Sequence, residues 1–367
     1  MNVCILSSVH EALDTRIFYK EAKTLVKAGY DVSLIAQHDK EETIENIEII
    51  ALPKPKNRFE RFFKTNYLLF KKAVKQRADV YHFHDPELMP IGLVLKLCTD
   101  AKLIYDAHED TSRDILAKKW INSVVLRKFI SIIFEKFEKI SCLAFDKIIT
   151  ISAPIAQRFP NYKTLVIQNL PILKLIKDAV PIKIKKTKPI IIYSGGLNEV
   201  RGIKEIIQAV GLLRGEVKLW LLGDFKEKNF EEDCKKINGW QYTEYFGYKN
   251  QNELYGFLKS ADIGIINFLP RPHNVYALPN KPFEYMACFL PVIMSNFPYW
   301  QSIFKDCVLY CAPNNPEDIA KKIKFLLDNP TETRKLKERG KNLILEKYNW
   351  ENESKKLLYL YNDLSKR

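Results

Sequence analysis

Two charged side chains three residues apart carry the clearest chemical signal in this sequence. Lys281 and Glu284 lie at the start of a short predicted helix, 281–288, which is followed by a tight turn and a buried strand. Side chains three positions apart share one face of a helix, so an ammonium group and a carboxylate can reach the same ligand. The N–H groups at the start of the helix favour negative charge. This combination is suited to a phosphorylated ligand that also carries hydroxyl groups.

A glycine pair earlier in the chain is suited to the same kind of ligand. Ser194-Gly195-Gly196 follows an isoleucine-rich predicted strand and precedes a helix that begins near Gly202. Glycines let the backbone approach a phosphate closely, and the N-terminus of the helix favours its charge. Arg201, just before that helix, can bind two phosphate oxygens at once. A plain turn and a solvent-exposed arginine would give the same pattern, so the nucleotide-sugar site that we expect depends on both segments together.

Histidines and acids follow two predicted strands in the first half of the chain, where an open parallel sheet places its ligands. A metal centre is one interpretation. However, the spacing matches no zinc motif, and the chain has no Asp-x-Asp to hold a divalent ion on a diphosphate. We therefore expect no metal, with His108 facing a substrate hydroxyl and His82 packed in the core. The candidate residues at these strand ends are His84, Asp85, His108 and Glu109.

The composition restricts the partners and the compartment. The 367 residues are enough for two domains, and the net charge of +14 favours a polyanionic partner: phosphorylated substrates, an anionic membrane or nucleic acid. Seven cysteines without a Cys-x-x-Cys motif indicate reduced thiols. The first residues are typical of a strand rather than an export signal, and no apolar run is long enough to span a membrane. We expect a cytoplasmic protein that is peripheral on the inner face of the cell membrane.

Two basic amphipathic helices, predicted at 57–76 and 120–145, indicate how the protein could contact a membrane. Aromatic residues recur at helical spacing in the first, and residues 54–77 contain nine Lys or Arg and one Glu. Aromatic side chains packed in the core explain this pattern as well as docking onto an anionic bilayer does. Nucleic acid ranks third, because no nucleic-acid-binding motif occurs, and we expect no such partner.

Strands and helices alternate along the chain, which predicts parallel sheets with helices on both faces. The pattern runs through 1–172, is interrupted by a lysine-rich segment at 173–188, and restarts over 189–349. We expect an α/β architecture of two doubly wound Rossmann-like domains facing a central cleft, with 173–188 as the linker. The final helix, 350–367, is a candidate to cross back onto the first domain.

In these segments the chain resembles the retaining glycosyltransferases of family four, which have the GT-B fold, and in particular members that assemble bacterial surface polysaccharides. The likeness covers nearly the whole chain. Its motifs lie at 8–10, 14–22, 79–85, 105–109, 194–197, 201–202, 278–281 and 283–287. The combination is specific, whereas any one of these pieces is not.

The resemblance implies a role for each candidate residue, and it assigns His84, Asp85, His108 and Glu109 to the acceptor side. Arg201 occupies the position of a diphosphate-binding lysine, and Lys281 lies beside the same phosphates. Glu284 would accept hydrogen bonds from the donor ribose, and His108 would face the donor sugar. The remaining donor-binding residues that it implies are Gly195, Gly196, Asn280 and, beside the base, Phe246, Gly247 and Tyr248.

Two positions depart from the family pattern. Tyr276 stands where many members have a glutamate on the donor sugar, and Gly196 stands where many have an arginine. These departures put the sugar contacts in doubt and leave the backbone of residues 274–280 to hold the donor sugar.

The resemblance implies transfer of a sugar from a UDP- or GDP-linked donor to a lipid-linked or oligosaccharide acceptor, with retention and without a further cofactor. Arg201 and Lys281 would stabilise the charge that grows on the diphosphate, and the leaving phosphate would take the acceptor proton. Two alternatives stay open. One is a GT-B sugar-nucleotide epimerase, for which no suitable set of carboxylates can be assigned. The other is a non-catalytic basic protein that binds membranes or nucleic acid.

Overall fold

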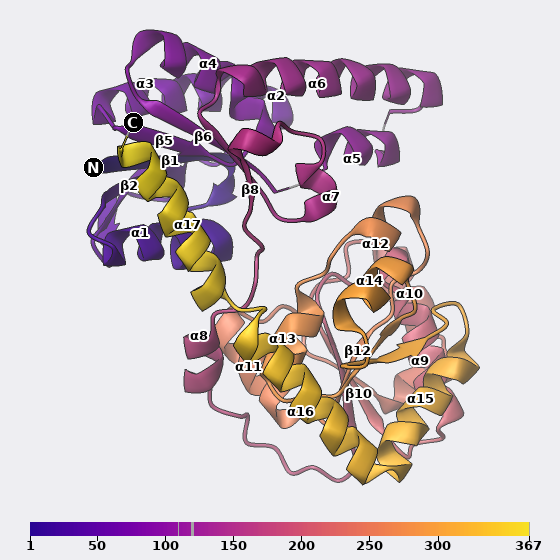
Figure 1. The fold of residues 1–367 in the computed structure, drawn as a ribbon. Helices are drawn as coiled ribbons and strands as arrows, with labels where there is room; N and C mark the ends of the chain where they lie inside the picture. Colours follow the sequence, from indigo (N-terminus) through magenta and orange to yellow (C-terminus); the bar gives the residue numbers. More distant parts are fainter. Residues whose placement is uncertain (109, 119–120, 367) are drawn as a thin grey trace. The chain divides into compact units, whose positions relative to one another are not determined.

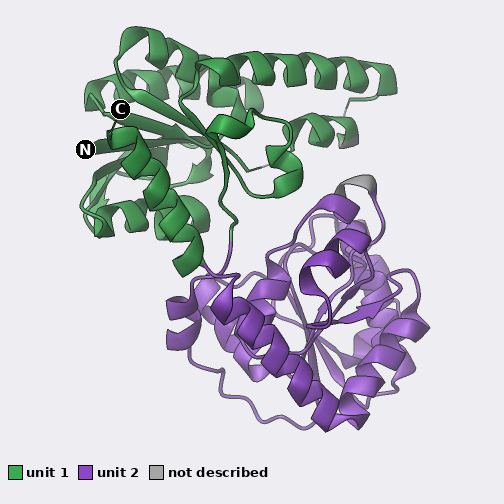
Figure 2. Ribbon diagram, in the orientation of Figure 1, with its two compact units in different colours: residues 1–169, 350–367 green, residues 170–349 purple. Residues whose placement is uncertain are grey.

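The computed structural model describes residues 1–367 apart from 109, 119–120 and 367, and it divides into two compact units (Figure 1; Figure 2). Unit 1 comprises residues 1–169 and 350–367, and unit 2 comprises residues 170–349. Each contains a sheet of mainly parallel strands with helices on both faces, which confirms the expected pair of Rossmann-like domains. The predicted linker is partly helical, because α8 (Leu173–Asp178) forms there and buries Ile176 in the core of unit 2.

Unit 1 has an eight-stranded sheet in the order β3-β4-β2-β1-β5-β6-β7-β8, and all neighbours except β3 and β4 run parallel. The strands are β1 (Asn2–Glu11), β2 (Asp31–Gln37), β3 (Glu42–Ile44), β4 (Ile47–Leu52), β5 (Val80–Phe83), β6 (Lys102–Ala107), β7 (Lys147–Thr150) and β8 (Thr164–Val166). The chain order reverses between β1 and β5. Such a switch point opens a crevice at the carboxyl ends of the two strands.

The helices of unit 1 cover both faces of this sheet. They are η1 (Thr15–Ala22), α1 (Lys23–Lys27), α2 (Arg58–Glu60), η2 (Arg61–Thr65), α3 (Asn66–Gln76), η3 (Pro86–Leu88), α4 (Met89–Cys98), α5 (Thr111–Ala117), α6 (Val124–Ala144), α7 (Ala153–Ala156), η4 (Asn161–Lys163) and α17 (Trp350–Ser365). Helix α17 belongs to this unit although it ends the chain. Trp350 Nε1 donates to Thr24 Oγ1 at 3.0 Å, and Tyr361 Oη lies 3.0 Å from Nδ1 of His82.

Unit 2 has a six-stranded parallel sheet in the order β11-β10-β9-β12-β13-β14. Its strands are β9 (Ile190–Ser194), β10 (Lys218–Leu222), β11 (Thr243–Tyr245), β12 (Ile263–Ile266), β13 (Val292–Ser295) and β14 (Leu309–Cys311). β9 is buried along its whole length, as its run of isoleucines predicts for a central parallel strand. The chain order reverses between β9 and β12, so the switch point lies at the end of β9.

The helices of unit 2 after α8 complete two apolar layers, one on each face of the sheet. They are η5 (Glu199–Arg201), α9 (Ile203–Leu212), α10 (Lys228–Lys235), η6 (Asn238–Tyr242), α11 (Gln251–Ser260), α12 (Pro272–Tyr276), α13 (Lys281–Ala287), α14 (Pro298–Phe304), α15 (Pro316–Asp328) and α16 (Pro330–Glu346). All seven cysteines of the protein are free, and five of them are buried.

Candidate functional site

A cavity of about 300 Å³ opens at the carboxyl ends of β9 and β10 in unit 2. The loop after β9 contributes Ser194, Gly195 and Gly196 to its lining, and α13 contributes Lys281 and Glu284. The structure thus brings together the two segments that carried the chemical signal in the sequence. Its volume is at the lower end of the range for small-molecule sites.

Lys281 lies directly across Gly195. A Cβ atom on Gly195 would overlap Cε of Lys281 and stand 2.7 Å from Nζ, and the backbone φ of +127° also favours glycine. Burial, together with the nearby charge of Arg201, lowers the pKa of Lys281 to about 8, although the charge of Glu284 acts in the opposite direction. A partly desolvated ammonium group is therefore held against the loop, where an anionic ligand would stabilise its charged form.

Backbone contacts fix the loop that faces Lys281. The N–H of Gly195 donates to the carbonyl of Leu222 at 2.8 Å, and the N–H of Gly223 donates to the carbonyl of Gly247 at 2.8 Å. A Cβ on Gly223 would overlap the carbonyl of Gly195, and its φ is +121°. The ends of β9 and β10 can approach this closely only because both positions are glycine.

Tyr285 joins the loop to α13. Its buried hydroxyl accepts a hydrogen bond from the N–H of Ser194 at 2.8 Å and lies 3.0 Å from Ser194 Oγ. The ring fits because β12 has a glycine below it: a Cβ on Gly264 would overlap the ring. The sequence analysis gave Tyr285 no role. The glycine in the middle of an apolar strand was the available signal, since it often marks a close approach.

Arg201 stands beside the cavity rather than in its lining. Its guanidinium carbon lies 3.8 Å from the centroid of the Phe268 ring, a cation–π contact that orients the side chain. Burial lowers the pKa of Arg201, and its charge reaches Lys281, as the lowered pKa of that lysine shows. Gly202 follows with a φ of +62°, where a side chain would overlap the carbonyl of Asn267.

The three residues expected beside a nucleotide base have different positions. Tyr248 is exposed and lines the cavity, whereas Gly247 holds Gly223 through its carbonyl. Phe246 packs against Trp220 and Phe257, with ring centroids 5.5 and 4.8 Å away. Only Tyr248 therefore offers its side chain to a ligand in this cavity.

The segment before α13 is held by its backbone. The carbonyl of Asn280 accepts from the N–H groups of Phe283 and Glu284 at 3.1 and 3.3 Å. The Asn274 side chain donates to the carbonyl of Leu269 at 3.0 Å, and Tyr276 is exposed. Asn280 thus shapes the turn that delivers Lys281.

Two cations in the cavity lining, Lys226 and Lys249, were missed by the sequence analysis, as was Asp224. Asp224 and Lys226 follow β10 at the same edge of the sheet as Gly195. Applying the rule for carboxyl ends of strands to β10 as well as β9 would have found them.

In unit 1, His108 follows β6 and meets two other histidines. Its ring centroid lies 5.3 Å from that of His10 and 6.0 Å from that of His84. Burial lowers the pKa of His108, so the imidazole is neutral at pH 7, and its buried Nδ1 has no hydrogen-bond partner among the described residues. The sequence analysis did not include His10 among the candidate residues. In the structure, Nε2 of His10 lies 3.7 Å from a carboxylate oxygen of Asp85, which was a candidate.

Asp85 and His84 are buried, which differs from the expectation that they face an acceptor. Asp85 accepts hydrogen bonds from Ser7 Oγ at 2.8 Å and from the N–H groups of Ser8 and Val9 at 2.7 and 3.2 Å. It therefore anchors the carboxyl-terminal part of β1, which carries His10. Glu109, the other expected acceptor-side residue, lies outside the described residues.

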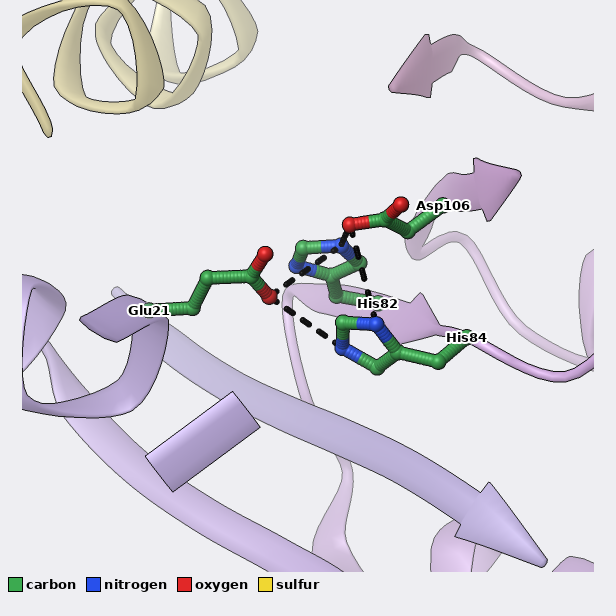
Figure 3. Close-up of side chains that lie close together, drawn as sticks. All are labelled: Glu21, His82, His84 and Asp106. Carbon is green, nitrogen blue, oxygen red and sulfur yellow. Dashed lines mark ion pairs between the residues drawn. The ribbon is translucent and has the colours of Figure 1, made fainter. Parts of the chain in front are cut away.

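His84 also belongs to a buried cluster with Glu21, His82 and Asp106 (Figure 3). Nε2 of His84 is 3.2 Å from Glu21, Nδ1 of His84 is 3.6 Å from Asp106, and Nε2 of His82 is 3.8 Å from Asp106. One ligand atom from each of the four lies within 4.8 Å of all the others, so by donor type and spacing this cluster could hold a metal ion.

A guanidinium group already balances the charge of this cluster. Arg16 Nη2 contacts Asp106 at 2.6 Å, and Arg16 Nε contacts Glu21 at 3.0 Å. Although burial raises the pKa of Asp106, the charge of Arg16 lowers it well below its usual value, whereas burial raises the pKa of Glu21 to about 7. Burial also lowers the pKa of His84 to about 4. The absence of a metal stays a prediction, and Arg16 is the cation that these carboxylates contact.

Both units match glycosyltransferase family models. Residues 176–343 match the family described as glycosyl transferases group 1, and residues 15–167 match glycosyltransferase family 4. The chain is 21% identical to an MMP alpha-(1->4)-mannosyltransferase of Mycolicibacterium hassiacum, and the aligned region covers 78% of this chain and 71% of that protein. Over 49% of its length it is 27% identical to an uncharacterized glycosyltransferase of Methanocaldococcus jannaschii, of which it spans less than half, 46%.

Solved structures share the fold over the whole chain. Sucrose-phosphate synthase from Thermosynechococcus elongatus has a TM-score of 0.78 at 19% identity, covering 99% of this chain and 98% of that one. Anabaena HepE in complex with UDP-glucose has a TM-score of 0.74 at 11% identity, covering 99% and 100%. The two family models together match most of the chain, one on each unit, so this chain is a glycosyltransferase, and its fold is that of the GT-B class. Within that class, its two units match the family 4 and group 1 glycosyltransferases.

Proposed function

We propose that the protein transfers a sugar from a nucleoside diphosphate donor to a lipid-linked or oligosaccharide acceptor, with retention of configuration, in the assembly of a surface polysaccharide. The observation that carries this proposal is Lys281, held across Gly195 in the same cavity as Glu284 and near Arg201. UDP- or GDP-linked hexoses are the donors that we propose. The UDP-glucose bound by HepE and the mannosyl transfer named for the mycobacterial relative support this choice.

The proposed reaction breaks the bond between the sugar and the diphosphate and forms a bond from an acceptor hydroxyl to the same sugar carbon. Negative charge grows on the diphosphate, and Lys281 and Arg201 stabilise it. Because Gly195 and the ring of Phe268 already position these two cations, little reorganisation accompanies the reaction. A preorganised group of this kind typically contributes on the order of 10²–10³ in rate.

The proton of the acceptor hydroxyl passes to an oxygen of the leaving phosphate in this proposal. The acceptor then attacks from the side on which the phosphate leaves, which retains the configuration. Glu284 accepts hydrogen bonds from the ribose, and Tyr248 lies beside the base. Lys226 and Lys249 add positive charge to the same cavity lining.

A thermal-shift titration with UDP-, GDP- and ADP-sugars tests donor binding. A donor at 100 times its Kd is expected to stabilise the wild-type protein by about 2.7 kcal/mol. Arg201→Ala and Glu284→Ala should lose this stabilisation and most of the transfer activity while the protein stays folded. Arg334→Ala and Glu338→Ala are matched controls, since both side chains lie on the exposed surface of α16. Wild-type transfer rates in both site variants would refute the assignment.

We propose a cytoplasmic location, because seven free thiols suit a reducing compartment. In the part of the chain that the structure describes, no helix combines the length and the apolar character that crossing a bilayer requires.

A further inference from the structure

Helix α6 lies on the outside of unit 1 (Figure 1). It exposes a stripe of apolar side chains to solvent. Six side chains, each at least half exposed, recur at helical spacing along it. They define the α6 apolar face: Val125, Phe129, Ile132, Ile133, Ile140 and Leu143. Single exposed hydrophobic residues are common, but a continuous stripe of this size marks a contact surface.

The opposite side of α6, which packs on the rest of unit 1, is largely polar: Ser131, Glu138 and Ser141 are buried there beside Cys142, and Phe134 packs against the core. Ser131 Oγ donates to the carbonyl of Ser112 at 2.7 Å, and Glu138 accepts from the hydroxyl of Tyr105 at 3.0 Å and from Arg158 at 2.6 Å. A surface helix of a globular protein normally buries its apolar side. α6 thus leaves most of its apolar residues outside the core of unit 1, and burial within unit 1 does not account for these exposed residues.

Lysines accompany the stripe. At 3.6 residues per turn, Lys136 falls within the stripe and Lys128 and Lys139 fall along one edge. Lys139 pairs with Glu135 at 2.8 Å, whereas Lys128 and Lys136 are exposed and form no ion pair within the described ranges of the chain. Two ammonium groups without counter-charges are thus available to an anionic surface.

The second basic segment has the same character. Phe59, Phe63 and Tyr67 are 57–73% exposed, so these aromatic side chains are not core residues, which was the alternative explanation of their spacing. α3 packs on α4, and α4 packs on α6, so these helices lie in one layer on the same face of the sheet. Leu97 on α4 is 86% exposed.

We propose that α6 lies in the surface of an anionic lipid bilayer, with its apolar face among the acyl chains and its lysines at the lipid phosphates. A helix of this length measures roughly 31 Å and has the mixed apolar and basic surface of helices that lie in the plane of a membrane. A second copy of the chain would cover the apolar residues but would bring like charges together, so charge favours the bilayer. The further step, that the acceptor is lipid-linked, rests on the proposed transferase function, whereas the docking does not.

Co-sedimentation of the full chain with phosphatidylcholine vesicles, with and without phosphatidylglycerol, tests the docking. Wild-type protein should bind the anionic vesicles preferentially. Lys128→Gln with Lys136→Gln should weaken this binding about 30-fold, at about 1 kcal/mol per lysine. Phe129→Asn with Ile140→Asn should weaken it about tenfold or more. Two matched controls should bind like wild type. Tyr359→Asn changes an exposed apolar residue of α17, and Lys321→Gln with Lys335→Gln removes two exposed lysines of unit 2.

Equal binding to both kinds of vesicle, or wild-type binding by both α6 variants, would overturn the proposal. So would a dimer in solution that Phe129→Asn with Ile140→Asn dissociates, because the face would then join two copies. The UDP-induced thermal shift is measured in the same preparations. Loss of docking with an intact shift would leave the transferase proposal standing, and docking without any shift would leave the membrane proposal standing.

Discussion

The hydroxyl of Tyr285 is expected to hold the donor loop in its binding conformation. Tyr285→Phe removes the acceptor for the buried N–H of Ser194 without changing the volume of the side chain. An unsatisfied buried donor costs about 1–3 kcal/mol, so the free energy of unfolding should fall by that amount. We expect the loop to avoid this cost by adopting a second conformation in which the N–H of Ser194 finds another partner. The population of the conformation that binds nucleotide then falls, and the Kd for nucleotide rises in proportion. For a cost of about 1.4 kcal/mol, the Kd would rise tenfold.

A matched substitution in unit 1 separates stability from donor binding. The buried hydroxyl of Tyr81 donates to the carbonyl of Ala73 at 2.9 Å, so Tyr81→Phe deletes a comparable hydrogen bond far along the chain from the cavity. Urea denaturation should show similar losses in both variants. Titration calorimetry with UDP, or with GDP if that is the nucleotide that stabilises wild type, should show weaker binding only in Tyr285→Phe. Wild-type affinity in Tyr285→Phe, with its stability reduced, would refute the argument that this hydroxyl positions the loop.

Four further predictions concern the charged groups. In the proposed function Lys281 binds phosphate as an ammonium, and burial lowers its pKa to about 8, so UDP affinity measured by calorimetry should fall as the pH rises above about 8. Lys281→Arg should flatten this profile, and an unchanged profile would contradict it. The raised pKa of Glu21, about 7, means that the folded state loses stability as the pH rises from about 4.5 to about 7. Glu21→Gln should therefore gain stability relative to wild type between pH 5 and pH 8 in urea melts, whereas a constant difference would exclude this titration. Chelation with EDTA should leave the melting temperature and transfer unchanged, because Arg16 balances the cluster; a lower melting temperature would reveal a bound ion. His108→Ala should slow transfer without changing UDP affinity, and an unaffected rate would remove His108 from the site.

The sequence could predict those parts of the site that depend on residues close together in the chain. An apolar run followed by two glycines defines the end of β9, and a spacing of three on a helix brings Lys281 and Glu284 to one side. The sequence analysis missed Tyr285 because its partner, Ser194, is 91 residues away in the chain, and only the folded structure shows their contact. Asp85 was placed toward an acceptor by its position after a strand, but backbone N–H groups of the neighbouring strand β1 bind its carboxylate inside the protein.

Two features of the fold show a similar limit. The hairpin between β3 and β4 was not predicted, because its turn uses Glu45 and Asn46 at φ values of +48° and +63° instead of an Asn-Gly pair. The amphipathic period of α6 was evident from the sequence. Periodicity alone does not say which side faces the protein, and here the buried side carries Ser131 and Glu138.

Because α17 packs on unit 1, the synthesis of unit 2 is completed before that of unit 1. All residues of unit 2 have left the ribosome once residue 349 emerges, so its sheet can close around a continuous stretch of chain. The synthesis of unit 1 starts before that of unit 2. However, Thr24 and the buried His82 lack their partners until Trp350 and Tyr361 have been synthesised. The polar cluster that contains His82 is therefore covered only after unit 2 has been synthesised.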